Sequence, residues 1–266
     1  QIRNQKHTLS LLYKDLKRSQ NLNYRGTKEV DTNSNKELFN RLEICNVSYK
    51  YSSDSRNTID DISLELNRGE SIGIIGPSGS GKTTLVDIAL GLLEPEAGKI
   101  LVNDRNIHDD LTIFQNEVAY IPQEIFIIDD SLKNNIALGL KESSIDNDLL
   151  LDVVKKTRLL ELVEELSSGL QTELGEHGVR LSGGQRQRVA IARALYHKRS
   201  VLIMDEATSS LDTQTEREIV EGIKILKGKT TMIVIAHRLN TLQHCDRIYE
   251  LNKGKISRVT SYDAIK

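Results

Sequence analysis

Apolar and polar residues alternate along the chain from Arg41 onward, as they do in half-buried strands. The apolar positions are Leu42, Ile44, Val47, Tyr49, Tyr51, Ile62, Leu64 and Leu66. Because successive side chains of a strand point to opposite faces, this period of two places one face of each strand on a core. We therefore predict that an antiparallel β layer opens the domain.

Short runs that are apolar throughout indicate a second kind of strand. They are residues 71–76 (SIGIIG), 118–121, 201–204 (VLIM) and 231–236 (TMIVIA). Each has the length of a strand that is buried on both faces in a parallel sheet. A helix is expected after the first run, with Leu85, Ile88, Ala89 and Leu92 on one face. Together these segments predict a parallel α/β core.

Helical spacing replaces the strand pattern between about residues 129 and 197. The residues that keep this spacing are Leu150, Val153, Val154, Thr157 and Leu160. We therefore predict an α-helical subdomain over about 129–197, inserted before the strand at 201–204.

The N-terminal part of the chain has a different character from the rest. Residues 8–20 predict a short amphipathic helix, and a polar stretch typical of a linker follows it. We place a boundary near Leu38, so that 1–38 is a residual helix and linker and 39–266 is one domain. The chain begins at Gln1 without a methionine, and we expect it to be part of a longer protein. No apolar run approaches the length of about 18 residues that a membrane-spanning helix needs.

Charge and cysteine content narrow the possible partners. The chain has 36 Lys and Arg against 38 Asp and Glu, a net charge of -2, so no basic field favours nucleic acid as a partner. The two cysteines, Cys45 and Cys245, lack the spacing of a metal site or a disulfide framework. Reduced thiols and a cytosolic setting are the simplest interpretation.

A glycine-rich segment between the first apolar run and its helix matches GxxxxGK[ST]. It consists of Gly76, Pro77, Ser78, Gly79, Ser80, Gly81, Lys82 and Thr83, and Thr84 follows it. Glycines let backbone N–H groups turn inward around a phosphate, and the helix N-terminus adds positive potential. We expect Lys82 to contact the β and γ phosphates and the Thr83 hydroxyl to ligate Mg²⁺.

Two acidic residues follow the apolar run at 201–204. Asp205 and Glu206 come where open α/β sheets place their chemistry, at the carboxyl end of a strand. Asp205 is expected to hold Mg²⁺ through its water shell. Glu206 is expected to polarise a water molecule for attack on the γ phosphate.

A second phosphate site is predicted at residues 181–185, LSGGQ. Ser182 is a helix N-cap and Gln185 stands three residues later, the spacing of a capping box. Gly183 and Gly184 then leave a helix N-terminus bare for an anion.

With these motifs the sequence resembles the ATP-binding cassette (ABC) ATPases over residues 41 to about 258. Further matches are Gln123 in AYIPQE (the Q-loop), Asp212 in SSLD (the D-loop) and His237 in IAHRL (the switch histidine). The resemblance implies a P-loop NTPase (RecA-like) core of parallel sheet, with an antiparallel β subdomain and an inserted α-helical subdomain. It implies ATP and Mg²⁺ as cofactors, catalytic roles for Glu206, His237 and Lys82, and Gln123 as a further metal ligand.

The family also implies how the nucleotide is held. Two copies of the cassette would form a head-to-tail dimer around two ATP molecules, with Ser182, Gly183, Gly184 and Gln185 contributing from the partner copy. Asp212 would be a further nucleotide-binding residue. An aromatic residue would stack on the adenine. We favour Tyr51 for this role, with Tyr49 as the competitor. Stacking on one ring reads the face of a purine and leaves ATP against GTP open.

The segment 172–178, TELGEHG, resembles the X-loop of ABC exporters, with His177 where that family usually has Arg. This resemblance implies a transmembrane domain in the same polypeptide, a place at the cytoplasmic face of the inner membrane, and export or flipping of a substrate. A soluble ABC ATPase that remodels nucleic acid or ribosomes is the alternative. A cassette that binds ATP without turnover is a third possibility, which the presence of Glu206 does not support.

Overall fold

The computed structural model describes residues 39–51, 56–205, 220, 223–224, 226–236 and 238–265. The predicted helix and linker within 1–38 and the predicted site residues Glu206, Asp212 and His237 lie outside this part of the chain. The boundary near Leu38 stays a prediction.

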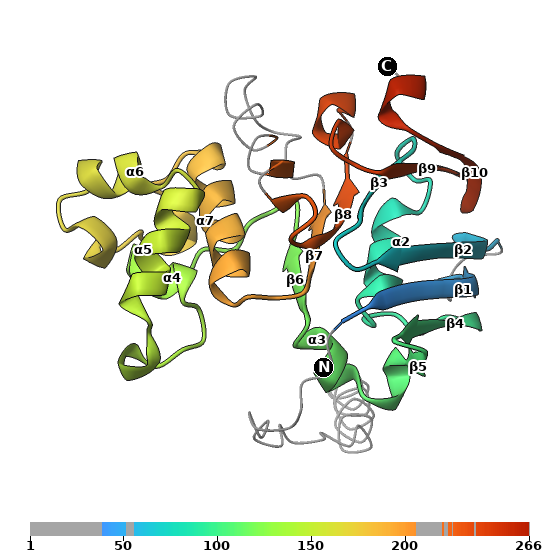
Figure 1. Ribbon diagram of the computed structural model, residues 1–266, viewed down its shortest axis with the longest axis horizontal. Helices are drawn as coiled ribbons and strands as arrows, with labels where there is room; N and C mark the ends of the chain where they lie inside the picture. Colours follow the sequence, from blue (N-terminus) through green and yellow to red (C-terminus); the bar gives the residue numbers. More distant parts are fainter. Residues whose placement is uncertain are drawn as a thin grey trace, which may run out of the picture. The chain divides into compact units, whose positions relative to one another are not determined.

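An antiparallel sheet of order β2-β1-β4-β5 lies on one side of the molecule in Figure 1. Its strands are β1 (Arg41–Tyr49), β2 (Ile59–Asn67), β4 (Ala97–Val102) and β5 (Arg105–Asn106). In β1 and β2 the apolar members of the alternation pair across the strands, with Leu42 opposite Leu66 and Ile44 opposite Leu64. The predicted antiparallel layer is confirmed. Strands β4 and β5 were not predicted.

The central sheet has the order β10-β9-β3-β8-β7-β6. Its strands are β3 (Ser71–Ile75), β6 (Val118–Ile121), β7 (Val201–Asp205), β8 (Thr231–Ile235), β9 (Arg247–Asn252) and β10 (Lys255–Thr260). All neighbours run parallel except β10, which is antiparallel to β9. The parallel core predicted from four apolar runs is confirmed, and the β9–β10 hairpin adds to it.

Helix α2 (Lys82–Ala89) packs between the two sheets. Its residues Leu85, Ile88 and Ala89 are buried in the core cluster that also holds residues of both sheets. The prediction that Leu92 shares this face was wrong, since the helix ends at Ala89. Gly91 turns the chain with a φ of 69°, and Leu92 is 61% exposed. Helix α3 (Leu111–Gln115) follows β5.

Four α-helices gather on the other side of β6 in Figure 1, around a core cluster of their own. They are α4 (Leu132–Ile136), α5 (Asn147–Lys156), α6 (Leu160–Glu165) and α7 (Gly183–Tyr196). Leu150, Val153 and Val154 are buried as expected. Leu160 was misassigned: a turn after α5 with Arg158 at a φ of 54° restarts the helical phase, so that Leu159 is buried and Leu160 is exposed.

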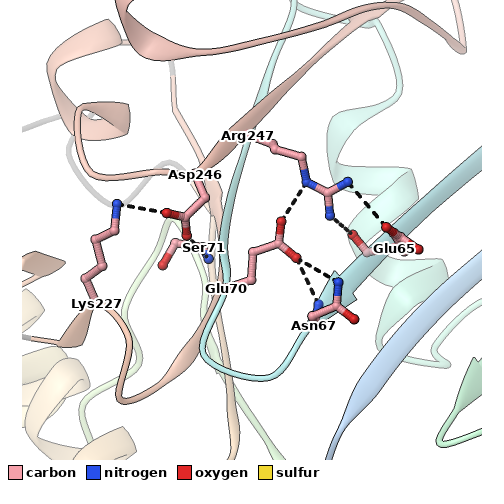
Figure 2. Close-up of polar contacts among 7 residues, drawn as sticks. All are labelled: Glu65, Asn67, Glu70, Ser71, Lys227, Asp246 and Arg247. Carbon is pink, nitrogen blue, oxygen red and sulfur yellow. Dashed lines mark hydrogen bonds and ion pairs between the residues drawn. The ribbon is translucent and has the colours of Figure 1, made fainter.

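A charged network joins the two sheets at the amino end of the central strands, as Figure 2 shows. Arg247 at the start of β9 donates from Nε to Glu70 Oε1 (2.6 Å) and from a terminal nitrogen to the carbonyl oxygen of Glu65 in β2 (3.1 Å). Glu70 Oε2 accepts from the backbone N–H of Asn67 (3.0 Å). These contacts fix the turn between β2 and β3.

Among the described residues, no helix is long and apolar enough to cross a membrane.

Candidate active site

Four predicted site segments meet at the carboxyl edge of the central sheet because their strands run parallel. The glycine-rich loop follows β3, Gln123 follows β6 by two residues, and Asp205 ends β7. Ala236 follows β8 and precedes His237 in the sequence. Since β3, β8, β7 and β6 are adjacent in this order, the segments converge on one side of the sheet.

The loop between β3 and α2 has the backbone of a phosphate cradle. Gly79 and Gly81 have φ values of 74° and 103°, in the left-handed region that favours glycine. Gly81 caps α2 without any side-chain hydrogen bond, so the first turn of the helix carries no capping side chain of its own. Lys82 is buried, and its Nζ donates to the carbonyl oxygens of Gly76 (2.9 Å) and Pro77 (3.2 Å).

The hairpin of β9 and β10 contacts this loop through Gly254. The N–H of Gly254 donates to the carbonyl oxygen of Ser80 (3.0 Å), and the N–H of Asp60 donates to that of Gly254 (2.8 Å). A Cβ on Gly76 would lie 2.3 Å from the carbonyl oxygen of Leu251. We missed this support, although the turn Asn-Lys-Gly-Lys between two alternating segments was a readable hairpin signal.

The residues of the loop differ in their exposure to solvent. Pro77, Ser78, Gly79 and Thr83 are exposed. Ser80 is buried, and among the residues that the structure describes its Oγ has no hydrogen-bond partner. An unsatisfied buried hydroxyl in a glycine-rich loop is a hydrogen-bond donor suited to an anion.

Asp205 is buried at the end of β7, where Tyr120 of β6 approaches it. Tyr120 Oη donates to Asp205 Oδ2 over 3.5 Å. Burial, followed by the charges of Asp205 and Asp87, raises the pKa of Tyr120 from 10.0 to about 12, so that the phenol keeps its proton well above neutral pH. Sequence reasoning missed the role of Tyr120, because the contact depends on the pairing of β6 with β7, which the sequence analysis did not predict.

The two candidate tyrosines for adenine stacking are placed differently. Tyr51 is 39% exposed, and its Oη lies 3.4 Å from Oγ1 of Thr84 in the first turn of α2. Tyr49 is half-buried and packs on the core. The two rings form an edge-to-face pair with centroids 5.1 Å apart. Tyr51 therefore has its ring beside the phosphate loop and open to a ligand.

The capping box predicted in LSGGQ is confirmed at the start of α7. Ser182 Oγ accepts from the N–H of Gln185 (3.2 Å), and Gln185 Oε1 accepts from the N–H of Ser182 (2.7 Å). Gly183 and Gly184 form the first helical positions, with Gly184 buried. The serine keeps its own O–H proton for a further acceptor, and Ser182 is exposed.

Two polar side chains, half-buried Arg193 and buried Asn135, connect the segment after exposed Gln123 to α7. Arg193 donates to the carbonyl oxygens of Asn135 (2.9 Å) and Phe126 (3.2 Å). Asn135 is fully buried, and its amide donates to the carbonyl oxygens of Ile128, Asp130 and Ser131. The helix that begins with LSGGQ is thereby fastened to the chain leaving the Q-loop.

The X-loop segment borders the same connection. Leu174 is buried and anchors it, while His177 is exposed with a φ of 53°. A Cβ on Gly178 would lie 3.0 Å from Ile127, so the two segments are in contact. Phe126 and Val179 flank this contact and are 59% and 77% exposed.

Comparison with known proteins decides the family. The family model described as ABC transporter matches residues 59–209, more than half of the chain. The chain belongs to the ABC transporter family. As the ATPase domain of that family it binds and hydrolyses ATP. The glycine-rich loop, Gln123, LSGGQ and Asp205 lie within the matched region.

Similar proteins place the domain among exporters. The ATP-dependent lipid A-core flippase of Ralstonia nicotianae is 38% identical over 217 residues, 81% of this chain and 37% of that protein. The ATP-dependent lipid A-core flippase 1 of Colwellia psychrerythraea is 41% identical over 204 residues, 76% of this chain and 34% of that protein. Among solved structures, a bacterial Atm1-family ABC exporter with ATP bound has a TM-score of 0.78 at 32% identity, covering 86% of this chain and 40% of that chain.

The chain therefore spans well under half the length of these relatives. Its type is that of an exporter nucleotide-binding domain, and the soluble ATPase alternative is not favoured.

Proposed function

We propose that this domain drives export or flipping of a substrate across the inner membrane, from its cytoplasmic face, through a transmembrane domain in the same polypeptide. The observation that carries the proposal is the convergence of the glycine-rich loop, Gln123 and Asp205 on one edge of the sheet. The lengths of the export proteins that it resembles support an additional domain.

The loop and its flanks supply the contacts for ATP. Backbone amides at the start of α2, the Ser80 hydroxyl and the Lys82 ammonium are donors for the phosphates. Lys82 Nζ now donates to the carbonyl oxygens of Gly76 and Pro77, and on binding it would donate to phosphate oxygens instead. Tyr51 would stack on the adenine beside the first turn of α2.

The residues at this edge also suit Mg²⁺. Mg²⁺ is commonly held by one or two protein oxygens together with phosphates and water. Thr83 offers an exposed hydroxyl, Asp205 a carboxylate and Gln123 an amide oxygen. When bound, Mg²⁺ would neutralise phosphate charge.

Glu206 and His237 complete the catalytic set in this proposal. Glu206 follows Asp205 directly at the carboxyl end of β7, where a general base can orient an attacking water. His237 follows Ala236 in the sequence after β8, the strand next to β7, and would contact the γ phosphate. Lys82 stabilises the charge that develops on the phosphoryl group during transfer.

Two copies of the domain would share each site. The capping box leaves the Ser182 hydroxyl and the amides of Gly183 and Gly184 as donors at a second helix N-terminus. In a head-to-tail dimer these donors, with Gln185 and Asp212 nearby, would close over the ATP that the loop of the other copy holds.

The transmembrane domain would dock where the X-loop meets the chain after Gln123. Phe126 and Val179 are large apolar side chains exposed on either side of the contact between Gly178 and Ile127. Contiguous exposed apolar surface is typical of interaction sites, and these two side chains would be part of it.

The sequence of the complete gene tests the exporter assignment. We expect about six apolar stretches of about 20 residues each upstream of Gln1. The complete protein, reconstituted in lipid vesicles, should then move substrate only with ATP, and Lys82→Ala should stop it. A complete protein without apolar stretches would contradict the proposed membrane partner.

A further inference from the structure

Tyr120 stands out among the residues around Asp205 because it lies in the AYIPQE segment, where only Gln123 was given a role. Its hydroxyl lies 3.5 Å from Asp205 Oδ2, and the hydrogen bond can only run from the phenol to the carboxylate. The ring is 37% exposed although it belongs to a strand of the central sheet. Its outer end therefore reaches the open edge where the site segments converge.

The register of the sheet explains why these two side chains meet. Tyr120 is the in-register neighbour of Ile203 across the parallel pair of β6 and β7. Asp205 lies two residues beyond Ile203 and so points to the same face of the sheet. Ile203 packs in the cluster with α2, which identifies this face as the one on the side of the phosphate loop. A long side chain at position 120 spans the offset of two residues.

A carboxylate that binds a cation through one oxygen is oriented by what the other oxygen accepts. Asp205 is buried, and a donor on Oδ2 fixes the plane of its carboxylate. Hydrogen bonds of this kind are often long without the ligand and tighten in its presence. The hydroxyl of Tyr120 has the position and the chemistry of such a partner.

We propose that Tyr120 is a positioning residue that orients the Asp205 carboxylate toward the Mg²⁺ of bound nucleotide. This inference rests on the proposed role of Asp205 in holding Mg²⁺. Tyr120 would act through Asp205 and would not itself touch the nucleotide.

The test compares nucleotide affinity with and without Mg²⁺, using a non-hydrolysable ATP analogue and isothermal titration calorimetry. In Tyr120→Phe the gain in affinity that Mg²⁺ provides should fall about threefold to tenfold, the range for one lost hydrogen bond. Affinity measured in EDTA should stay at the wild-type value. Tyr262→Phe is the matched control, because Tyr262 Oη also lies 3.5 Å from a side-chain acceptor, Asn240 Oδ1.

Asp205→Asn distinguishes a failure of the proposed role of Asp205 from a failure of the proposed role of Tyr120. If Asp205→Asn keeps the full Mg²⁺-dependent gain, the proposed role of Asp205 fails and the inference falls with it. If Asp205→Asn loses the gain but Tyr120→Phe keeps it, only the inference is overturned. If Tyr120→Phe weakens binding of the ATP analogue equally with and without Mg²⁺, Tyr120 has a purely structural role. This outcome also overturns the inference. In the double variant, Tyr120→Phe should add nothing to the effect of Asp205→Asn.

Discussion

Arg193 in the helix that begins with LSGGQ donates from both terminal nitrogens to the carbonyl oxygen of Phe126, each at 3.2 Å. Phe126 lies three residues beyond Gln123. Burial lowers the pKa of Arg193, yet a guanidinium keeps its charge in proteins. The cation also donates to the carbonyl oxygen and to Oδ1 of Asn135. The segment after Gln123 and the helix that begins with LSGGQ are thereby joined by hydrogen bonds.

Arg193→Met should lower the free energy of unfolding by about 1 to 3 kcal/mol, because the carbonyl oxygens of Asn135 and Phe126 lose their charged donor. Urea unfolding followed by circular dichroism measures this change. Lys156→Met is the control, since Lys156 makes an exposed pair with Asp152 at 2.6 Å and should change stability by less than about 0.5 kcal/mol. Equal effects of the two substitutions would show that Arg193 does not hold this connection.

Glu206→Gln should leave ATP binding intact and reduce turnover by about 10² to 10⁴, the usual effect of removing a general base. ATP should then hold two copies of the domain together, because the nucleotide is no longer consumed. Phosphate release and size-exclusion chromatography with ATP measure the two effects. Hydrolysis at the wild-type rate would mean that another group activates the water.

Tyr51→Ala should weaken ATP affinity by about 1 to 2 kcal/mol, the range for stacking on an aromatic ring and desolvated cation–π contacts. Tyr49→Ala should do less, because the Tyr49 ring packs on the core while that of Tyr51 is open beside Thr84. Equilibrium binding of both variants decides the assignment. A larger loss at Tyr49 would place the adenine on the other ring.

The pKa of Glu70 makes part of the stability depend on pH. Burial alone would raise this pKa, but hydrogen bonds from Arg247 and Asn67 outweigh it and bring it below the ordinary 4.5. The contribution of Glu70 is therefore complete above about pH 4.5 and is lost as the pH falls through the lower, folded-state value. Glu70→Gln should flatten the fall in unfolding free energy below this pH, measured by urea titration. The exposed Glu164→Gln should leave the slope unchanged, and an equal flattening there would contradict the assignment.

Much of the architecture could be predicted because burial patterns are local. The parallel strands at 71–75, 201–205 and 231–235 are apolar throughout, and the capping box of Ser182 and Gln185 depends only on spacing. The phosphate loop is likewise a local motif.

Other features depend on contacts between distant segments. The exposure of Leu92 depends on the turn at Gly91, and that of Leu160 on the turn at Arg158. Tyr120 meets Asp205 only through the register of two strands that are far apart in the sequence. The link from Arg193 to Phe126 is equally non-local.

The central claim is that each ATP site is shared between two copies, the phosphate loop of one and LSGGQ of the other. Lys82→Ala spoils the first element, and Ser182→Arg fills the second with bulk and charge. Two copies of the same variant should fail to associate with each other when ATP is added. In a mixed dimer, the Ser182→Arg chain contributes an intact phosphate loop and the Lys82→Ala chain an intact LSGGQ, so one of the two sites is whole.

ATP-driven association of the mixture, followed by light scattering, is the most direct measurement of this claim. Both variants are first shown to be folded by circular dichroism. The shared-site account predicts that association absent from either variant alone partly returns when the two are mixed. If each site were built within one chain, every site in the mixture would still carry a defect. No recovery on mixing would contradict the account.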